Sequence, residues 1–131
     1  MSYIFDSSAI FKAIKENAIE FLAGNLTLNL TRYEMGNIIW KEYTIHKRID
    51  RQEALKIIKI FKDALSLMEN LAINCNEEEI LKIADDLKIT FYDAAYIYYA
   101  KSRGIPLITE DRKLMEKAEQ HVKILKFEDI I

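Results

Sequence analysis

The stretch Tyr3-Ile4-Phe5-Asp6-Ser7-Ser8-Ala9-Ile10 decides the fold. Its apolar, β-favouring start predicts a strand, and its small hydroxyl residues lead directly into a helical pattern. Asp6 therefore follows the end of a first strand. In an open parallel α/β sheet, ligands bind in the crevice at the carboxyl ends of the strands. Asp6 is thus placed for chemistry rather than for packing, and it is the first candidate functional residue.

The composition fits a single domain over residues 1–131. Half of the residues are hydrophobic, which is enough for a real core. Nineteen Lys and Arg against 21 Asp and Glu leave a net charge of -2, so any nucleic acid must be held by local basic residues. The single cysteine excludes an internal disulfide. The apolar start is too short for a signal peptide, and no apolar run approaches the roughly 18 residues of a membrane span. We expect a soluble, cytoplasmic protein.

Strand and helix patterns alternate along the rest of the chain. The helix predicted at residues 50–68 keeps its apolar residues at helical spacing, and it should form an antiparallel hairpin with the helix before it. Alternation of this kind favours a parallel sheet in a three-layer α/β/α arrangement. After the first strand, the sequence predicts strands at 26–30, 71–75, 107–109 and 122–127, and helices at 9–15, 31–48, 50–68, 76–87, 90–104 and 111–119.

Four acids follow these strands or open these helices, and each has an ordinary structural explanation. Asp6 can cap the first helix, and Asp111 can complement the dipole of the helix that it opens. Thr31 with Glu34 has the spacing of a capping box. The residues around Asp93 have the same spacing. Three of the four acids differ from ordinary helix caps in their position. Asp6, Glu34 and Asp111 all belong at the carboxyl edge of one sheet.

Asp93 supports a metal site by a different argument. It lies on the most apolar helix of the chain, where a buried carboxylate is costly unless it is paired, protonated or bound to a cation. The sequence offers it no obvious basic partner. Four converging acids repel one another, and a divalent cation is the usual resolution. Because all candidate ligands are oxygens, Mg²⁺ or Mn²⁺ fits best.

The roles of the candidate residues follow from this chemistry. We predict Asp6, Asp93 and Asp111 as metal ligands, with Asp111 helping to bind a second ion or acting through water. Glu34 would position the attacking water or act as its base. Thr109 would orient a carboxylate through its hydroxyl. Glu110 and Glu42 remain alternatives for completing the metal site.

Four segments together resemble the PIN domain, and specifically the VapC toxin type: Asp6-Ser7-Ser8, Thr31-Arg32-Tyr33-Glu34-Met35, Tyr92-Asp93-Ala94-Ala95-Tyr96 and Leu107-Ile108-Thr109-Glu110-Asp111. The resemblance spans the whole chain. It implies a sheet of strand order 3-2-1-4-5 and an Mg²⁺- or Mn²⁺-dependent endoribonuclease that serves as the toxin of a toxin–antitoxin pair. It also implies an acid quartet at Asp6, Glu34, Asp93 and Asp111, a homodimer, and a VapB-type antitoxin.

Other interpretations remain open at this level. An apolar strip of Leu55, Ile60 and Leu67 could bind a partner helix or pack on a neighbouring helix of the same chain. The protein could be a PIN nuclease of RNA processing, or a non-enzymatic module that binds a partner through its acidic crevice. A phosphotransferase with Asp6 as nucleophile is disfavoured, because Ser8 occupies the position of the second aspartate that such enzymes carry.

Overall fold

The computed structural model describes residues 2–131. Strands and helices alternate, as the sequence predicts. The strands are β1 (Ile4–Phe5), β2 (Leu26–Leu28), β3 (Glu69–Leu71), β4 (Leu107–Ile108) and β5 (Ile124–Leu125). The helices are α1 (Ser7–Lys15), α2 (Leu30–Thr44), α3 (Arg51–Ser66), α4 (Glu77–Leu87), α5 (Phe91–Arg103) and α6 (Arg112–Ala118), with short 3₁₀ helices η1 (Ile19–Leu22) and η2 (Phe127–Asp129).

The five strands form one parallel sheet of order β3-β2-β1-β4-β5. Ile4 in the central strand is in register with Leu26 on one side and with Leu107 on the other. This confirms the predicted α/β class and the strand order 3-2-1-4-5. Because all strands run the same way, their carboxyl ends lie at one edge of the sheet.

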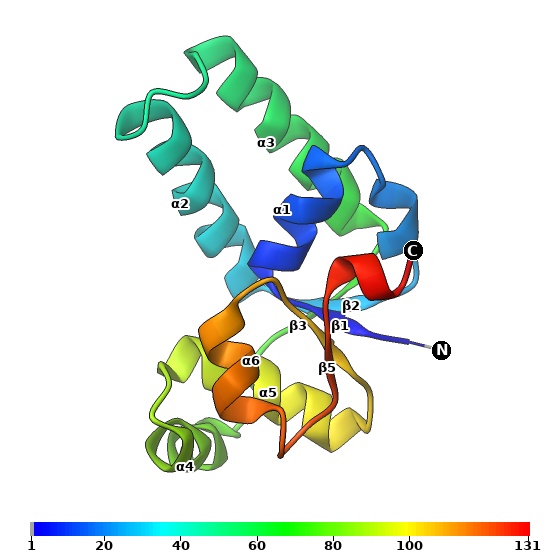
Figure 1. Ribbon diagram of the computed structural model, residues 1–131, viewed down its shortest axis with the longest axis vertical. Helices are drawn as coiled ribbons and strands as arrows, with labels where there is room; N and C mark the ends of the chain where they lie inside the picture. Colours follow the sequence, from blue (N-terminus) through cyan, green and yellow to red (C-terminus); the bar gives the residue numbers. More distant parts are fainter. Residues whose placement is uncertain (1) are drawn as a thin grey trace.

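The sheet separates two hydrophobic cores, which makes the fold three-layered. Phe5 and Ile108 point into the core under α1, α2 and α3, while their neighbours Ile4 and Leu107 point into the core under α4, α5 and α6. Figure 1 shows these two groups of helices on opposite sides of the sheet. The alternation follows from the two-residue period of a strand. It also explains why β1 and β4, which are buried on both faces, consist of apolar residues alone.

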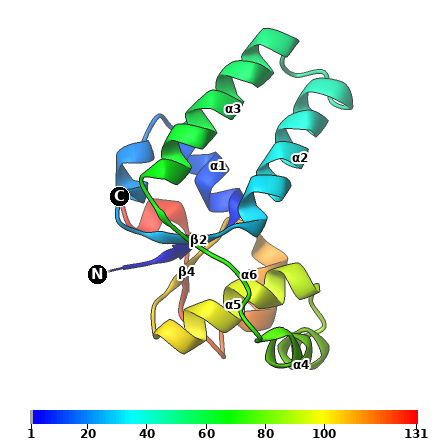
Figure 2. The ribbon, with the colours of Figure 1, turned by 180° about the vertical axis from the view of Figure 1, so that it is seen from behind.

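Helices α2 and α3 form the predicted antiparallel hairpin, which extends away from the sheet (Figure 2). Asp50 and Glu53 form a reciprocal capping box at the start of α3, and this confirms Asp50 as a cap. Gly104 ends α5 in the left-handed conformation, at φ 63°. No helix within residues 2–131 combines the length and apolar character that a membrane crossing requires.

The position of the third strand was predicted wrongly. The prediction placed it at residues 71–75, whereas β3 spans Glu69–Leu71. Its pairing with β2 explains the difference, since Glu69 is in register with Leu26 and Leu71 with Leu28. The ladder ends where β2 gives way to α2, so residues 72–75 have no strand partner and continue as an irregular connection to α4.

Candidate active site

Asp6 is both a helix cap and a buried carboxylate at the end of β1. Its Oδ1 accepts hydrogen bonds from the Ala9 N–H at 3.0 Å and from the Ser8 hydroxyl at 2.6 Å. Its Oδ2 accepts one from the Thr109 hydroxyl. The residue is only 5% exposed, and this burial raises the pKa of Asp6 to about 6 even though the three hydrogen bonds oppose the change. Folding therefore places a carboxylate that is costly to ionise at this edge.

Hydroxyl groups tie the end of β1 to the end of β4. The Ser8 hydroxyl accepts a hydrogen bond from the Glu110 N–H at 2.9 Å and lies 3.3 Å from the Thr109 hydroxyl. The Thr109 hydroxyl also accepts a bond from the Asp111 N–H at 3.1 Å. Thr109 is fully buried, so water does not compete for these bonds. The backbone that carries Asp111 is thereby fixed beside Asp6.

Glu34 reaches the same edge from the second turn of α2. Its Oε1 accepts hydrogen bonds from the Tyr96 hydroxyl at 2.7 Å and from the Ser7 hydroxyl at 3.4 Å. The side chain is half-buried, and burial together with the charge of Asp93 raises the pKa of Glu34 above its usual value.

The capping box predicted for Thr31 and Glu34 is wrong. Asn29 is the N-cap residue of α2, and Thr31 lies inside the helix. The buried Thr31 hydroxyl lies 2.8 Å from the Thr27 hydroxyl and 2.6 Å from the Tyr96 hydroxyl. Tertiary hydrogen bonds thus engage both residues, and the Glu34 side chain points into the crevice instead of back to the helix start.

Asp93 and Asp111 open helices α5 and α6. Asp93 follows the cap Thr90 and is half-buried, whereas the apolar pattern of its helix predicted full burial. Burial raises the pKa of Asp93, and the charge of Asp111 raises it further. Asp111 is exposed and caps α6 by accepting from the Leu114 N–H at 3.1 Å. Asp111 is therefore both a helix cap and one of the crevice acids, as Asp6 is.

The four acids come from four elements and lie near enough to influence one another's ionisation. The charge of Asp93 contributes to the raised pKa of both Asp6 and Glu34, and that of Asp111 to the raised pKa of Asp93. Among residues 2–131, none of the ion pairs involves any of the four. The crevice thus concentrates negative charge that no side chain in the described part of the chain neutralises.

The donor set fits a hard divalent ion that keeps part of its water shell. Within residues 2–131, no three His, Cys, Asp or Glu side chains are grouped closely enough to enclose an ion. Mg²⁺ is commonly bound through one or two carboxylates while keeping several waters. The fit is therefore to a partly hydrated ion rather than to a closed protein cage.

Glu110 and Glu42, the two alternatives for the fourth acid, are engaged elsewhere. The Glu110 carboxylate accepts a hydrogen bond from the Phe127 N–H at 2.9 Å, beyond the end of β5. Glu42 pairs with Arg48 at 3.1 Å, near the loop that joins α2 to α3. Asp111 remains the acid of this segment that faces the crevice acids.

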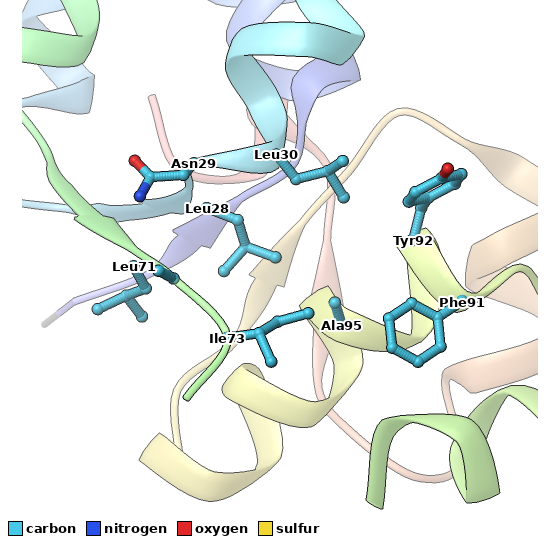
Figure 3. A pocket seen from close by; sticks show the side chains of 9 residues that line it. Leu28, Asn29, Leu30, Leu71, Ile73, Phe91, Tyr92 and Ala95 are labelled. Carbon is cyan, nitrogen blue, oxygen red and sulfur yellow. The ribbon is translucent and has the colours of Figure 1, made fainter. Parts of the chain in front are cut away.

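An apolar pocket lies where β2 and β3 end and α5 begins. It has a volume of about 220 Å³, and Figure 3 shows Phe91 and Tyr92 across from Leu28 and Leu71. Tyr92 is 59% exposed and directly precedes Asp93. The pocket thus begins one residue away from a crevice acid.

Thr109 bonds to Asp6, as the sequence predicted, but sequence reasoning missed two other residues that hold the acids in place. Ser8 closes the contact between β1 and β4, and Tyr96 anchors Glu34. A hydroxyl two residues after a capping aspartate is a usable local signal, since such side chains bond to nearby groups. Tyr96 gives no comparable signal, because its partner lies 62 positions away in the sequence.

Comparison with known proteins identifies relatives over nearly the whole chain. A family model described as the PIN domain matches residues 2–120. Exonuclease VapC9 from Pyrobaculum aerophilum is 32% identical over 126 residues, which cover 95% of this chain and 91% of the relative. Ribonuclease VapC3 from the same organism is 33% identical over 95 residues, covering 70% of this chain and 69% of the relative.

Solved structures share the fold. The crystal structure of PAE2754 from Pyrobaculum aerophilum matches with a TM-score of 0.80 and 30% identity, over 98% of this chain and 91% of that one. The structure of VapBC2 from Rickettsia felis bound to a DNA fragment from their promoter matches with a TM-score of 0.64. Its identity is 15%, over 96% of this chain and 98% of that one, so this second likeness concerns the fold alone.

Proposed function

Because this chain belongs to the PIN domain family, we propose that it is a metal-dependent endoribonuclease and the toxin of a toxin–antitoxin pair. One observation carries the proposal: four carboxylates from four elements lie near enough to raise one another's pKa, and within residues 2–131 no basic side chain pairs with them. The proposed nuclease activity is supported by two relatives whose names describe nucleases, Exonuclease VapC9 and Ribonuclease VapC3.

Asp6, Asp93 and Asp111 would hold the ion, which we propose to be Mg²⁺ or Mn²⁺. A divalent ion at such a site lowers the pKa of water and neutralises charge that develops on the leaving oxygen. Thr109 keeps Asp6 in one orientation through its hydroxyl. The crevice acids need a cation for another reason, since their mutual repulsion and burial otherwise oppose ionisation.

Glu34 would position the attacking water and accept its proton. Only its Oε1 has hydrogen-bond donors among residues 2–131, so Oε2 is available to water or substrate. The pKa of Glu34 is raised towards neutral pH, and a general base works best when its pKa lies near the pH of the reaction. Hydrolysis then breaks a phosphodiester bond as the water oxygen attacks phosphorus and Glu34 takes the proton.

Titration with Mn²⁺ tests the metal site. We expect the melting temperature of the wild-type protein to rise by about 10 °C once the free ion exceeds its dissociation constant about 100-fold, because such binding contributes about 2.7 kcal/mol. Cleavage of a pooled RNA should appear over the same range of concentration and disappear with a chelator. A protein that neither gains stability nor cuts RNA would rule out a metal site at the four acids and leave Asp6 and Asp111 as helix caps only.

An assay with a circular RNA substrate distinguishes cleavage within an RNA from cleavage at its ends. Since a circle has no ends, only an endonuclease can open it, and we expect this protein to do so. The name of the relative VapC9 describes an exonuclease, so this comparison matters. Degradation of linear RNA alone would change the proposed activity to an exonuclease that uses the same crevice.

The pocket beside Asp93 is proposed to receive an unpaired base of the RNA. Its lining is mostly apolar and includes the exposed Tyr92 ring, which offers a stacking surface next to the crevice. Stacking of a base on an aromatic ring is worth about 1–3 kcal/mol. A base held there would bring its neighbouring phosphate towards the acids.

Replacement of Tyr92 by alanine should raise KM for RNA about 10-fold, because a stacking contact of that size is lost. The value of kcat should change much less, since the acids stay in place. Steady-state kinetics with a short fluorogenic RNA would measure both. Tyr43→Ala is the matched control, since Tyr43 is 39% exposed on α2 and does not line the pocket. Equal KM values for the two variants would argue against a base in this pocket.

The proposed partners are a VapB-like antitoxin and a second copy of this chain. Two residues of the apolar strip on α3 are exposed, Leu55 at 58% and Leu67 at 45%, while Ile60 is half-buried. The chain itself therefore leaves most of this strip uncovered. An amphipathic helix of an antitoxin could lie along it and reach the acidic crevice with a basic residue. The complex of VapBC2, a structural neighbour, supports a partner of this kind.

A further inference from the structure

A chain of three buried hydroxyl groups joins the backbone of β1 to Glu34. The Thr27 hydroxyl donates to the Phe5 carbonyl at 2.8 Å and lies 2.8 Å from the Thr31 hydroxyl. The Thr31 hydroxyl lies 2.6 Å from that of Tyr96, which donates to Glu34 Oε1 at 2.7 Å. Thr27 and Thr31 are fully buried and Tyr96 is 1% exposed. Each hydroxyl therefore has protein partners and little access to water.

This chain restricts a side chain that is otherwise flexible. A glutamate has several rotatable bonds, and fixing them costs conformational entropy. The Tyr96 bond holds Oε1 and leaves Oε2 without a hydrogen-bond partner among residues 2–131. The carboxylate thus has one anchored oxygen and one oxygen available for chemistry.

The same bond sets Glu34 relative to Asp93. Tyr96 follows Asp93 by three residues on α5, so the two side chains lie on neighbouring positions of one helix face. Burial, together with the charge of Glu34, raises the pKa of Tyr96 far above its usual value. The hydroxyl therefore remains a hydrogen-bond donor throughout the working pH range.

We propose that Tyr96 is a positioning residue for RNA cleavage, holding Glu34 so that its free oxygen Oε2 receives the proton of the attacking water. The water O–H bond breaks towards Glu34 as the water oxygen bonds to phosphorus and the bond to the leaving oxygen breaks. Tyr96 touches none of the reacting atoms and acts through Glu34 alone. The inference rests on the proposed function and adds to it a residue from the core.

Another tyrosine of α5 provides the structural comparison. The Tyr98 hydroxyl accepts a hydrogen bond from the Asn76 side chain at 2.9 Å, ahead of α4. Removing either hydroxyl deletes a hydrogen bond between α5 and another part of the chain. Of these two tyrosine hydroxyls, the one of Tyr96 bonds to a crevice acid and the one of Tyr98 bonds to Asn76. If tyrosine hydroxyls of α5 serve stability alone, both losses should lower the melting temperature and leave kcat unchanged.

Tyr96→Phe should lower kcat for RNA cleavage about 10-fold or more, the size of effect seen when a group that orients an active-site side chain is removed. KM should change less than twofold, and the affinity for Mn²⁺, measured by its effect on the melting temperature, should be unchanged. Tyr98→Phe should keep the wild-type kcat. Thr31→Val, which removes the next hydroxyl of the chain, should lower kcat in the same direction by a smaller factor.

The outcomes separate this inference from the function on which it rests. A wild-type protein that binds no Mn²⁺ and cuts no RNA overturns the proposed function and this inference with it. An active wild type whose kcat is kept in Tyr96→Phe, or lowered equally in Tyr98→Phe, overturns the inference alone. If Tyr96→Phe does not fold, Thr31→Val decides, and a wild-type kcat in that variant counts against the inference.

Discussion

Replacement of Asp93 by asparagine is expected to lower the rate of RNA cleavage by on the order of 10³-fold, because a bound divalent ion contributes several kcal/mol to the stabilisation of a transition state. Asparagine keeps the size and shape of the side chain and removes its charge. In the absence of metal, the melting temperature of the variant should stay the same or rise. Burial and the nearby Asp111 charge already oppose ionisation of Asp93, so its neutral replacement removes an unfavourable charge.

Two measurements check this expectation together. Cleavage of a pooled RNA in saturating Mn²⁺ reports the chemistry, and thermal unfolding in chelator reports the fold. Asp85→Asn on α4 is the matched control, because Asp85 is an exposed helical aspartate whose partner is Lys88 at 3.3 Å. An Asp93→Asn protein that cuts RNA at the wild-type rate would remove Asp93 from the active site.

The metal-free protein should lose stability as the pH rises from about 4 to about 6. The pKa of Asp6 is raised from 3.8 to about 6 by burial, so between these values the folded state binds more protons than the unfolded state. The contribution of Asp6 to the free energy of unfolding is therefore largest below pH 4, and it is lost as the pH rises through the pKa that Asp6 has in the folded state. A shift of about two pKa units corresponds to about 3 kcal/mol. The raised pKa values of Glu34 and Asp93 act in the same direction.

Urea unfolding in chelator, at several pH values from 4 to 7, measures this loss. Asp6→Asn is the comparison, because it removes the titrating group and should flatten the curve over this window. Addition of Mn²⁺ at pH 7 should restore stability to the wild type and not to the variant. Parallel curves for the two proteins would show that Asp6 does not control the dependence on pH.

Much of the fold was predictable because the deciding signals are local. Strands and helices alternate visibly, Gly104 and Asp50 mark helix ends, and the apolar faces of the helices show which side packs. The third strand was misplaced because its limits depend on pairing with β2, which only the folded sheet reveals. The strand order itself was expected from the resemblance to the PIN domain and is confirmed.

The positions of the acids were predictable, and so was the bond from the Thr109 hydroxyl to a carboxylate, whereas the bonds made by Ser8 and Tyr96 were not. Asp6 and Asp111 follow strands whose carboxyl ends meet at one edge, so their convergence follows from the fold class. The wrong capping-box prediction for Thr31 shows the limit of local patterns. Its hydroxyl has the spacing of a cap but contacts hydroxyls of two other elements instead. The assignment of the four acids to catalysis and to metal binding stays a prediction.

The hydroxyl contacts around Asp6 also govern when the crevice can exist during synthesis. The bonds from Thr109 to Asp6 and from Glu110 to Ser8 join residues 103 and 102 positions apart, and the bond from Tyr96 to Glu34 spans 62. Contacts of such long range form only after a large entropic cost of loop closure is overcome. A growing chain carries Asp6 and Glu34 before β4 has been synthesised, and until then the bonds from Thr109 and Glu110 cannot form. Any cleavage activity therefore requires a chain that has been synthesised at least as far as Asp111.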